Sequence, residues 1–256
     1  MNVAGWRNQL AGLDPRQPWF APYAETLEAL RHAIAKGADA ATALSACSLP
    51  QRDSRVPGFV PAGDLPSSEA YESFVARTGA IPTRDNLHDL FNGLIWRQFP
   101  QAKGRLNQLQ AAQIAAQGAG VARGPVRDAI TVFDENGALL DAPAALWDAL
   151  LARDWPRAFV ELRPLWARAK VRVFGHALLE KLVRPRKEIT AHVWRAQCAM
   201  RSTAEVDGWL ANQLTADSLA GKPFMPLPLL GIPGWCGENQ HISFYDDPKV
   251  FRRPAA

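Results

Sequence analysis

Long apolar runs are missing from this sequence of 256 residues. No stretch approaches the roughly 20 apolar residues that a membrane-spanning helix needs, and the first residues lack the apolar core of a signal peptide. Cysteine is also scarce: Cys47, Cys198 and Cys236 are widely spaced and form no Cys-x-x-Cys pair. The sequence therefore indicates neither a disulfide framework nor a cysteine-based zinc site. We expect a soluble, cytoplasmic protein with no membrane partner.

The motifs of the common cofactor enzymes are absent as well. There is no glycine-rich phosphate loop, no dinucleotide-binding fingerprint and no serine nucleophile elbow. Hydrophobic residues make up 48% of the chain and charged residues 21%, which is typical of a globular protein. One hydrophobic core can support a chain of this length. We therefore predict a single domain over residues 1–256.

The hydrophobic periodicity favours a fold that is mainly α. We expect an N-terminal helical segment over residues 1–48, an irregular connection over 49–66, a helical core over 67–220 and an irregular, Pro-rich C-terminal wrap over 221–256. Within the core, the β-branched run Ala129-Ile-Thr-Val-Phe133 is followed by the turn-forming residues Asp134-Glu-Asn-Gly137. This pattern predicts one short β-hairpin near residues 129–140.

The most informative segment is a predicted helix near residues 85–99. Asp85, His88, Asp89 and Asn92 are three or four residues apart, so they fall together on one side of this helix. The opposite side is an apolar stripe that should face the core, formed by Leu87, Leu90, Phe91, Leu94 and Ile95. Trp96 lies within the polar arc, where a solvated helix face would rarely carry so large a ring. We therefore expect another element to cover this face.

Two further segments carry candidate ligands. In a predicted helix near residues 173–183, His176 and Glu180 are one turn apart, and such a pair can supply two metal ligands or an acid and a base. Gly175, directly before them, permits close approach by a neighbouring segment. His192 adds a third imidazole.

These residues support the hypothesis of a metal-assisted hydrolase. We assign metal binding to His88, His176 and His192, activation of water to Asp89 and Glu180, and substrate binding to Asp85, Asn92 and Trp96. Imidazole and carboxylate ligands suit zinc, manganese or iron, and the sequence does not choose among these divalent metals.

Two alternatives remain open. Residues 151–195 hold eleven Lys or Arg against four Asp or Glu, and aromatic residues such as Trp155 and Trp166 lie among them. The stretch from Arg153 to Arg195 could therefore bind nucleic acid or another anionic partner without any enzymatic activity. In the second alternative, the His and Asp residues form a buried hydrogen-bond network that only stabilises the fold.

Several motifs occur together in an order that resembles a known family. They are Asn86, His88-Asp89, Asn92, Trp96, Phe99-Pro100, Lys103, Leu106-Asn107, Phe133–Gly137, Gly175–Leu182, Thr190–His192, Pro226-Leu-Pro and Gly231–Trp235. This set resembles a bacterial family known only as domain of unknown function 3025, from about residue 60 to residue 250. The resemblance implies a bacterial origin and one family-wide domain that includes His88, His176 and His192. It implies no activity and no catalytic residues.

Overall fold

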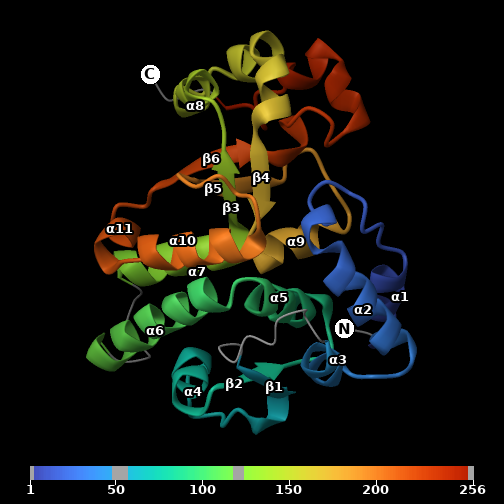
Figure 1. Cartoon of the computed structure of the whole chain (residues 1–256), viewed down its shortest axis with the longest axis vertical. Helices are drawn as coiled ribbons and strands as arrows, with labels where there is room; N and C mark the ends of the chain where they lie inside the picture. Colours follow the sequence, from blue (N-terminus) through green and yellow to red (C-terminus); the bar gives the residue numbers. More distant parts are fainter. Residues whose placement is uncertain (1–2, 48–56, 118–123, 253–256) are drawn as a thin grey trace.

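The structure is a computed structural model that describes residues 3–47, 57–117 and 124–252 (Figure 1). The described chain is mainly helical, as predicted. Its α-helices are α1 (Val3–Ala11), α2 (Ala24–Ala35), α3 (Ala40–Ala46), α4 (Tyr71–Thr78), α5 (Leu87–Gln98), α6 (Pro100–Gln117), α7 (Pro125–Asn136), α8 (Ala144–Leu151), α9 (His176–Leu182), α10 (Thr203–Gln213) and α11 (Ala216–Ala220). Its strands are β1 (Gly58–Pro61), β2 (Ala80–Thr83), β3 (Gly137–Asp141), β4 (Lys170–Val173), β5 (Thr190–Arg195) and β6 (Phe224–Pro228). No helix in these ranges is both long enough and apolar enough to cross a membrane.

Four of the strands form one mixed sheet in the order β4-β3-β5-β6. Strand β3 pairs antiparallel with β4 and parallel with β5, and β6 pairs antiparallel with β5. Pro226 and Pro228 lie in β6, an edge strand, where a residue without an N–H donor is tolerated. The strands β1 and β2 form a separate parallel pair.

The helices α5 and α6 cross the molecule between the β1–β2 pair and the layer of α7, α9 and α10 (Figure 1). Helix α5 packs against α3 and α9, α6 packs against α4 and α10, and α7 packs against α9 and β5. The aromatic ring of Phe133 in α7 stacks on Phe174 and on Phe224. This packing brings the end of α7 and the start of α9 next to α5, although the three helices are far apart in the sequence.

Helix α5 confirms the predicted apolar stripe, because Leu87, Leu90, Phe91, Leu94 and Ile95 are all buried. Trp96, on the polar side, is also buried, as expected for a face that other elements cover. The helix begins at Leu87, with Asn86 as its N-cap, and Pro100 begins the next helix, where its missing N–H costs no helical hydrogen bond.

The predicted hairpin near residues 129–140 was wrong. Residues 129–133 belong to α7, and only the following residues form a strand, β3, whose partners are β4 and β5. Ala129, Ile130 and Phe133 have helical spacing and are all buried. Their burial outweighs the weak strand preference of the β-branched residues, and Asp134-Glu-Asn136 completes the last helical turn instead of forming a hairpin turn.

Two segments predicted to be irregular also contain strands. The connection over residues 49–66 includes β1, which pairs with β2, while residues 48–56 lie outside the described ranges. The Pro-rich segment over 221–256 includes β6 at the edge of the main sheet, and several short 3-10 turns follow it. Local composition did not predict these strands because each is completed by a partner that is distant in the sequence.

Candidate metal centre and its cavity

Helix α5 presents the first polar residues of the site. The side-chain oxygen of Asn86 accepts a hydrogen bond of 2.7 Å from the backbone N–H of Asp89, which fixes the first turn of the helix. Helical geometry then places His88 and Asn92 one turn apart on the same face. Both residues line a cavity of about 460 Å³.

A close junction between α7 and α9 presents the second set of residues. The backbone N–H groups of Phe174 and Gly175 both donate to the carbonyl oxygen of Gly137, at 2.9 and 2.8 Å. A Cβ atom on Gly175 would lie 2.5 Å from the carbonyl oxygen of Glu135, so this approach requires glycine, as the sequence indicated. The junction places His176, the first residue of α9, beside the last turn of α7.

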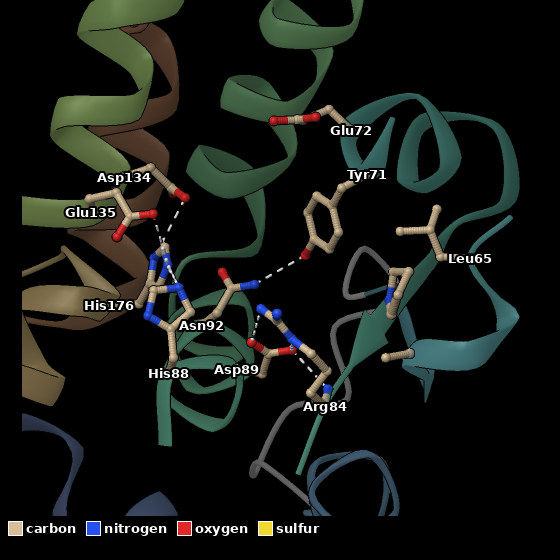
Figure 2. Close-up of a pocket in the computed structure, with 12 residues that line it drawn as sticks. Leu65, Tyr71, Glu72, Arg84, His88, Asp89, Asn92, Asp134, Glu135 and His176 are labelled. Carbon is tan, nitrogen blue, oxygen red and sulfur yellow. Dashed lines mark hydrogen bonds and ion pairs between the residues drawn. The ribbon is translucent and has the colours of Figure 1, made fainter. Parts of the chain in front are cut away.

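Three side chains converge from α5, α7 and α9 (Figure 2). The Nε2 atom of His88 lies 3.1 Å from Nε2 of His176, which lies 3.6 Å from Oε1 of Glu135. One ligand atom from each residue lies within 4.8 Å of the other two, and the described residues contain no second group of three His, Cys, Asp or Glu arranged in this way. Two imidazole nitrogens and one carboxylate oxygen form a donor set that can bind zinc, manganese or iron.

Each of these imidazoles has a second carboxylate next to its other nitrogen. Nδ1 of His88 lies 3.0 Å from Oε2 of Glu180, and Nδ1 of His176 lies 3.5 Å from Oδ2 of Asp134. Glu180 forms a hydrogen bond with His88 and favours the tautomer with its proton on Nδ1. Nδ1 of His176 forms no hydrogen bond with the described residues, and only the negative charge of Asp134 favours a proton there. With the proton on Nδ1, each ring has its lone pair on Nε2. Two such lone pairs 3.1 Å apart repel each other unless a cation or a proton lies between them.

Lys103 in α6 lies in the next layer of the site and is only 4% exposed. Its Nζ atom donates to Oδ1 of Asp134 at 2.5 Å and to Oδ1 of Asn92 at 2.8 Å, and it lies 5.4 Å from the centre of the Trp96 ring. Burial acts to raise the pKa of Asp134, but the charge of Lys103 and its hydrogen bond, together with the charge that His176 acquires in acid, outweigh burial and hold this pKa below its usual value. Asp134 is therefore a carboxylate fixed beside His176.

The two imidazoles have opposite pKa shifts. The hydrogen bond with Glu180 raises the pKa of His88 above its usual value. Burial lowers the pKa of His176 to about 4, so this ring is neutral at neutral pH. Burial also raises the pKa of the Glu135 carboxyl. Because metal ions bind the neutral form of imidazole, the environment of His176 favours the form that acts as a ligand.

The cavity is polar on the side of the three converging groups, and Leu65 lies on its opposite side (Figure 2). Between these sides, both carboxylate oxygens of Asp89 accept hydrogen bonds from the Arg84 guanidinium, at 2.9 and 3.0 Å. The backbone N–H of Arg84 also donates to Asp89, at 2.7 Å. Asp89 therefore holds the guanidinium in a fixed position at the cavity wall.

Most of the site residues predicted from the sequence lie around this cavity or directly behind it. His88, Asp89, Asn92 and His176 line it, and Glu180 contacts His88. Trp96 is buried beside Lys103 and lines a smaller adjoining cavity of about 160 Å³. The structure thus brings together residues of α5 and α9, whose segments are far apart in the sequence.

Asp85 and His192 lie elsewhere. Asp85 precedes α5, and its carboxylate accepts a hydrogen bond of 2.8 Å from the backbone N–H of Ala40 and lies 3.6 Å from the Arg7 guanidinium. It therefore contacts the N-terminal helices and is not among the residues that line the cavity. His192 lies in β5, between β3 and β6, and is not part of the three-residue group formed by His88, Glu135 and His176.

Among the residues at the cavity and behind it, Tyr71, Arg84, Lys103, Asp134 and Glu135 were not predicted from the sequence. Asp134 and Glu135 belong to the segment that was interpreted as a hairpin turn. The helical spacing of Ala129, Ile130 and Phe133 was the signal that would have placed both acidic residues on a helix. Lys103 and the Phe133–Gly137 motif were part of the family resemblance, but nothing in it assigned them a role.

The aromatic residues of the basic segment are in the core. Trp155, Phe159, Trp166, Phe174 and Trp194 are all buried, and Phe159 stacks against Trp155 and Trp166. Stacking of nucleic-acid bases needs exposed rings, so these side chains do not offer such a surface. Binding of an anionic partner to the basic side chains from Arg153 to Arg195 stays a prediction.

Comparison with known proteins identifies a family but no activity. The family model described as "Protein of unknown function (DUF3025)" matches residues 58–255, a range that contains His88, Glu135 and His176. No curated protein and no solved structure matches the chain. The chain belongs to the DUF3025 family, as its motifs predicted.

Proposed function

We propose that this protein is a metal-assisted hydrolase in which His88, Glu135 and His176 bind one divalent metal ion. The observation that carries the proposal is the convergence of two Nε2 atoms and one carboxylate oxygen beside a cavity. The sequence suggested His192 as the third ligand, and in this ligand set Glu135 replaces it. Glu180 and Asp134 would act as outer carboxylates that orient the two imidazoles.

The distances between the donor atoms fit a metal ion. With bonds of about 2.0–2.1 Å and tetrahedral angles, two nitrogens bound to one zinc ion lie ~3.3 Å apart. The separations of 3.1 Å between His88 and His176 and of 3.6 Å between His176 and Glu135 differ little from this value. The third pair, His88 and Glu135, lies within 4.8 Å, so rotation of the Glu135 side chain towards His88 would complete the site.

Three protein ligands leave a coordination position open for water or substrate, as in catalytic zinc sites. A metal ion at such a site acts as a Lewis acid and lowers the pKa of bound water to about 7. The cavity of about 460 Å³ provides space for a substrate next to this position, and Arg84 provides a positive charge at its wall. These features favour hydrolysis of an ester, amide or phosphate bond.

Asp89 and Glu180 were predicted from the sequence to activate water. In the structure, Asp89 accepts two hydrogen bonds from the guanidinium of Arg84, and Glu180 lies against Nδ1 of His88. We therefore propose positioning roles for both carboxylates, in which Asp89 holds Arg84 and Glu180 orients His88. Activation of the water would then come chiefly from the metal ion.

The decisive experiment measures metal content. The purified, untagged protein would be analysed by plasma mass spectrometry beside the variants His88→Ala, His176→Ala and Glu135→Gln. We expect near-stoichiometric zinc, manganese or iron in the parent and loss of the metal in all three variants. His192→Ala is the matched control, because it removes an imidazole that lies outside the proposed site and should keep the metal.

The same variants test the structural alternative. If the cluster only stabilises the fold, the parent protein contains no metal, and His88→Ala lowers the melting temperature without removing a ligand. That result would overturn the proposal. If metal is found, hydrolysis of p-nitrophenyl acetate and p-nitrophenyl phosphate by the parent and by Glu135→Gln would show whether the metal supports catalysis.

A further inference from the structure

The hydrogen bonds behind the cavity have a fixed direction. A lysine ammonium can only donate, so the Asn92 atom that lies 2.8 Å from Nζ of Lys103 must be the amide oxygen. The amide nitrogen of Asn92 therefore points the other way, and it donates to the hydroxyl of Tyr71 at 3.0 Å (Figure 2). Lys103 thus determines which group Asn92 presents to Tyr71.

Because the Tyr71 oxygen accepts this hydrogen bond, its own proton must point away from Asn92. Among the residues that the structure describes, no acceptor for this proton is found. Tyr71 lines the same cavity as His88, His176 and Glu135. Burial also raises the pKa of Tyr71, so the hydroxyl keeps its proton at neutral pH. The proton is therefore available to a molecule in the cavity.

We propose that Tyr71 is a substrate-binding residue that donates a hydrogen bond to an oxyanion of the substrate, and that Lys103 and Asn92 fix the direction of this donor. The inference rests on the proposed function, since it takes the cavity beside the metal centre as the substrate site. Arg84, which lines the same cavity and is held by Asp89, adds positive charge for the same group. The ligand class is an oxyanion, either a phosphate or a carboxylate.

Binding of two simple oxyanions tests the inference. The zinc-loaded full-length protein would be titrated calorimetrically with inorganic phosphate and, separately, with acetate, and the tighter ligand would indicate the substrate class. We expect Tyr71→Phe to weaken binding of that ligand by about tenfold, the effect of one lost hydrogen bond to a charged group, with zinc affinity unchanged. Equal binding by the parent and Tyr71→Phe, or no binding of either oxyanion by the parent, overturns the inference.

An isosteric substitution tests the role of Asn92. In Asn92→Asp both side-chain oxygens are acceptors, so the Tyr71 hydroxyl would turn and donate to the new carboxylate. The substitution also adds a negative charge, for which Asn107→Asp in α6 is the matched control, since Asn107 lines the smaller adjoining cavity. We expect Asn92→Asp to weaken oxyanion binding more strongly with Tyr71 present than in the Tyr71→Phe background. If Asn92→Asp weakens oxyanion binding equally with Tyr71 and with Tyr71→Phe, Asn92 does not set the direction of the Tyr71 hydroxyl.

A measurement on the metal-free protein separates this inference from the proposed function. Neutron diffraction would locate the deuteron of the Tyr71 hydroxyl without any bound ligand. A deuteron directed into the cavity supports the inference, and one directed at Asn92 overturns it. Failure of the parent protein to bind zinc, manganese or iron overturns the metal-assisted hydrolase, whereas the position of the deuteron decides the direction of Tyr71 in either case.

Discussion

The Nε2 atoms of His88 and His176 lie 3.1 Å apart, although the two residues are 88 positions apart in the sequence. Their rings are inclined by 77°, with centroids 4.6 Å apart. This is a T-shaped arrangement and not a parallel stack. A carboxylate lies behind each ring, next to Nδ1. Between two neutral rings, a hydrogen bond joining the Nε2 atoms requires one ring to move its proton away from Nδ1. A second proton on His88, whose pKa Glu180 raises, or a shared metal ion leaves the Nδ1 proton of both rings in place.

This relationship predicts a specific effect of Glu180→Gln. The variant keeps the shape of the side chain but removes the charge that holds the Nδ1 proton of His88. We expect zinc affinity to fall by about 10- to 100-fold, the usual cost of losing an outer carboxylate, whereas His88→Ala should abolish binding. Competition with a zinc chelator measures both affinities. Glu188→Gln, an exposed residue near Arg186, is the control, and equal zinc affinities in the two Gln variants would show that Glu180 does not orient His88.

Gly175→Ala should disrupt the site through the backbone. The new Cβ would lie 2.5 Å from the carbonyl oxygen of Glu135 and 2.6 Å from the backbone nitrogen of Gly137, so α9 must move away from α7. We expect the variant to be less stable by about 1–3 kcal/mol in urea unfolding and to bind zinc more weakly. Gly104→Ala, within α6 and with no atom within 4 Å of its added Cβ, should instead be slightly more stable. Unchanged stability and zinc affinity in Gly175→Ala would contradict the close junction.

Lys103→Met should be much more costly than loss of an exposed lysine. The substitution leaves the carboxylate of Asp134 without its cation and removes a donor from Asn92. We expect a loss of roughly 3 kcal/mol in urea unfolding, because an unpaired charge remains in a largely buried site. Lys222→Met is a matched control: its ammonium also contacts a carboxylate, that of Asp128, at 2.6 Å, but the two side chains are 54% and 47% exposed. Its cost should stay below about 1 kcal/mol.

A second substitution identifies the origin of that cost. If the unpaired carboxylate is responsible, the double variant Lys103→Met with Asp134→Asn should recover part of the lost stability. If the double variant is no more stable than Lys103→Met, the loss reflects packing of the lysine stem and not the charge. Circular dichroism at several urea concentrations measures both variants.

The helix α5 could be predicted from the sequence because its signals are local. Its apolar residues repeat with the helical period, and a capping residue and Pro100 lie near its two ends. The strand β6 could not be predicted in this way, since Pro226 and Pro228 suggest an irregular segment until β5 provides a partner. The wrong hairpin has a related cause: the helical spacing of Ala129, Ile130 and Phe133 is local, but the packing of Phe133 that favours the helix involves Phe174 and Phe224, which follow much later in the chain.

The site was predicted in part for the same reason. The spacing of His88 and Asn92 on one helix is a local feature, and so is the spacing of His176 and Glu180. The contact between Glu180 and His88 could not be predicted, because it joins α9 to α5. Glu135 was missed because its position depends on α7 being a helix, and its approach to His176 depends on the missing side chain of Gly175.

The pKa of His176 predicts how the stability of the metal-free protein depends on pH. Its pKa is about 4 in the folded protein, against a usual value of 6.5. Between these two pH values the unfolded chain binds a proton at this residue and the folded chain does not, so stability falls as the pH decreases from 6.5 towards 4. The free energy of unfolding falls by on the order of 3 kcal/mol over this range because of His176. The raised pKa of His88 has the opposite effect. It stabilises the folded protein fully below pH 6.5, and this stabilisation is lost as the pH rises from 6.5 through the folded-state pKa of His88.

Urea unfolding of the metal-free protein between pH 4.5 and 7 measures this dependence. We expect the parent to lose more stability on acidification than His176→Gln, which has no imidazole to protonate. His32→Gln, which replaces an exposed histidine in α2, should keep the pH dependence of the parent. Carboxylates remote from residue 176 titrate alike in all three proteins, so the difference between the curves belongs to His176 and to Asp134 beside it. Parallel curves for the parent and His176→Gln would mean that the ring of His176 is hydrated in the folded protein and is not held in its neutral form by burial.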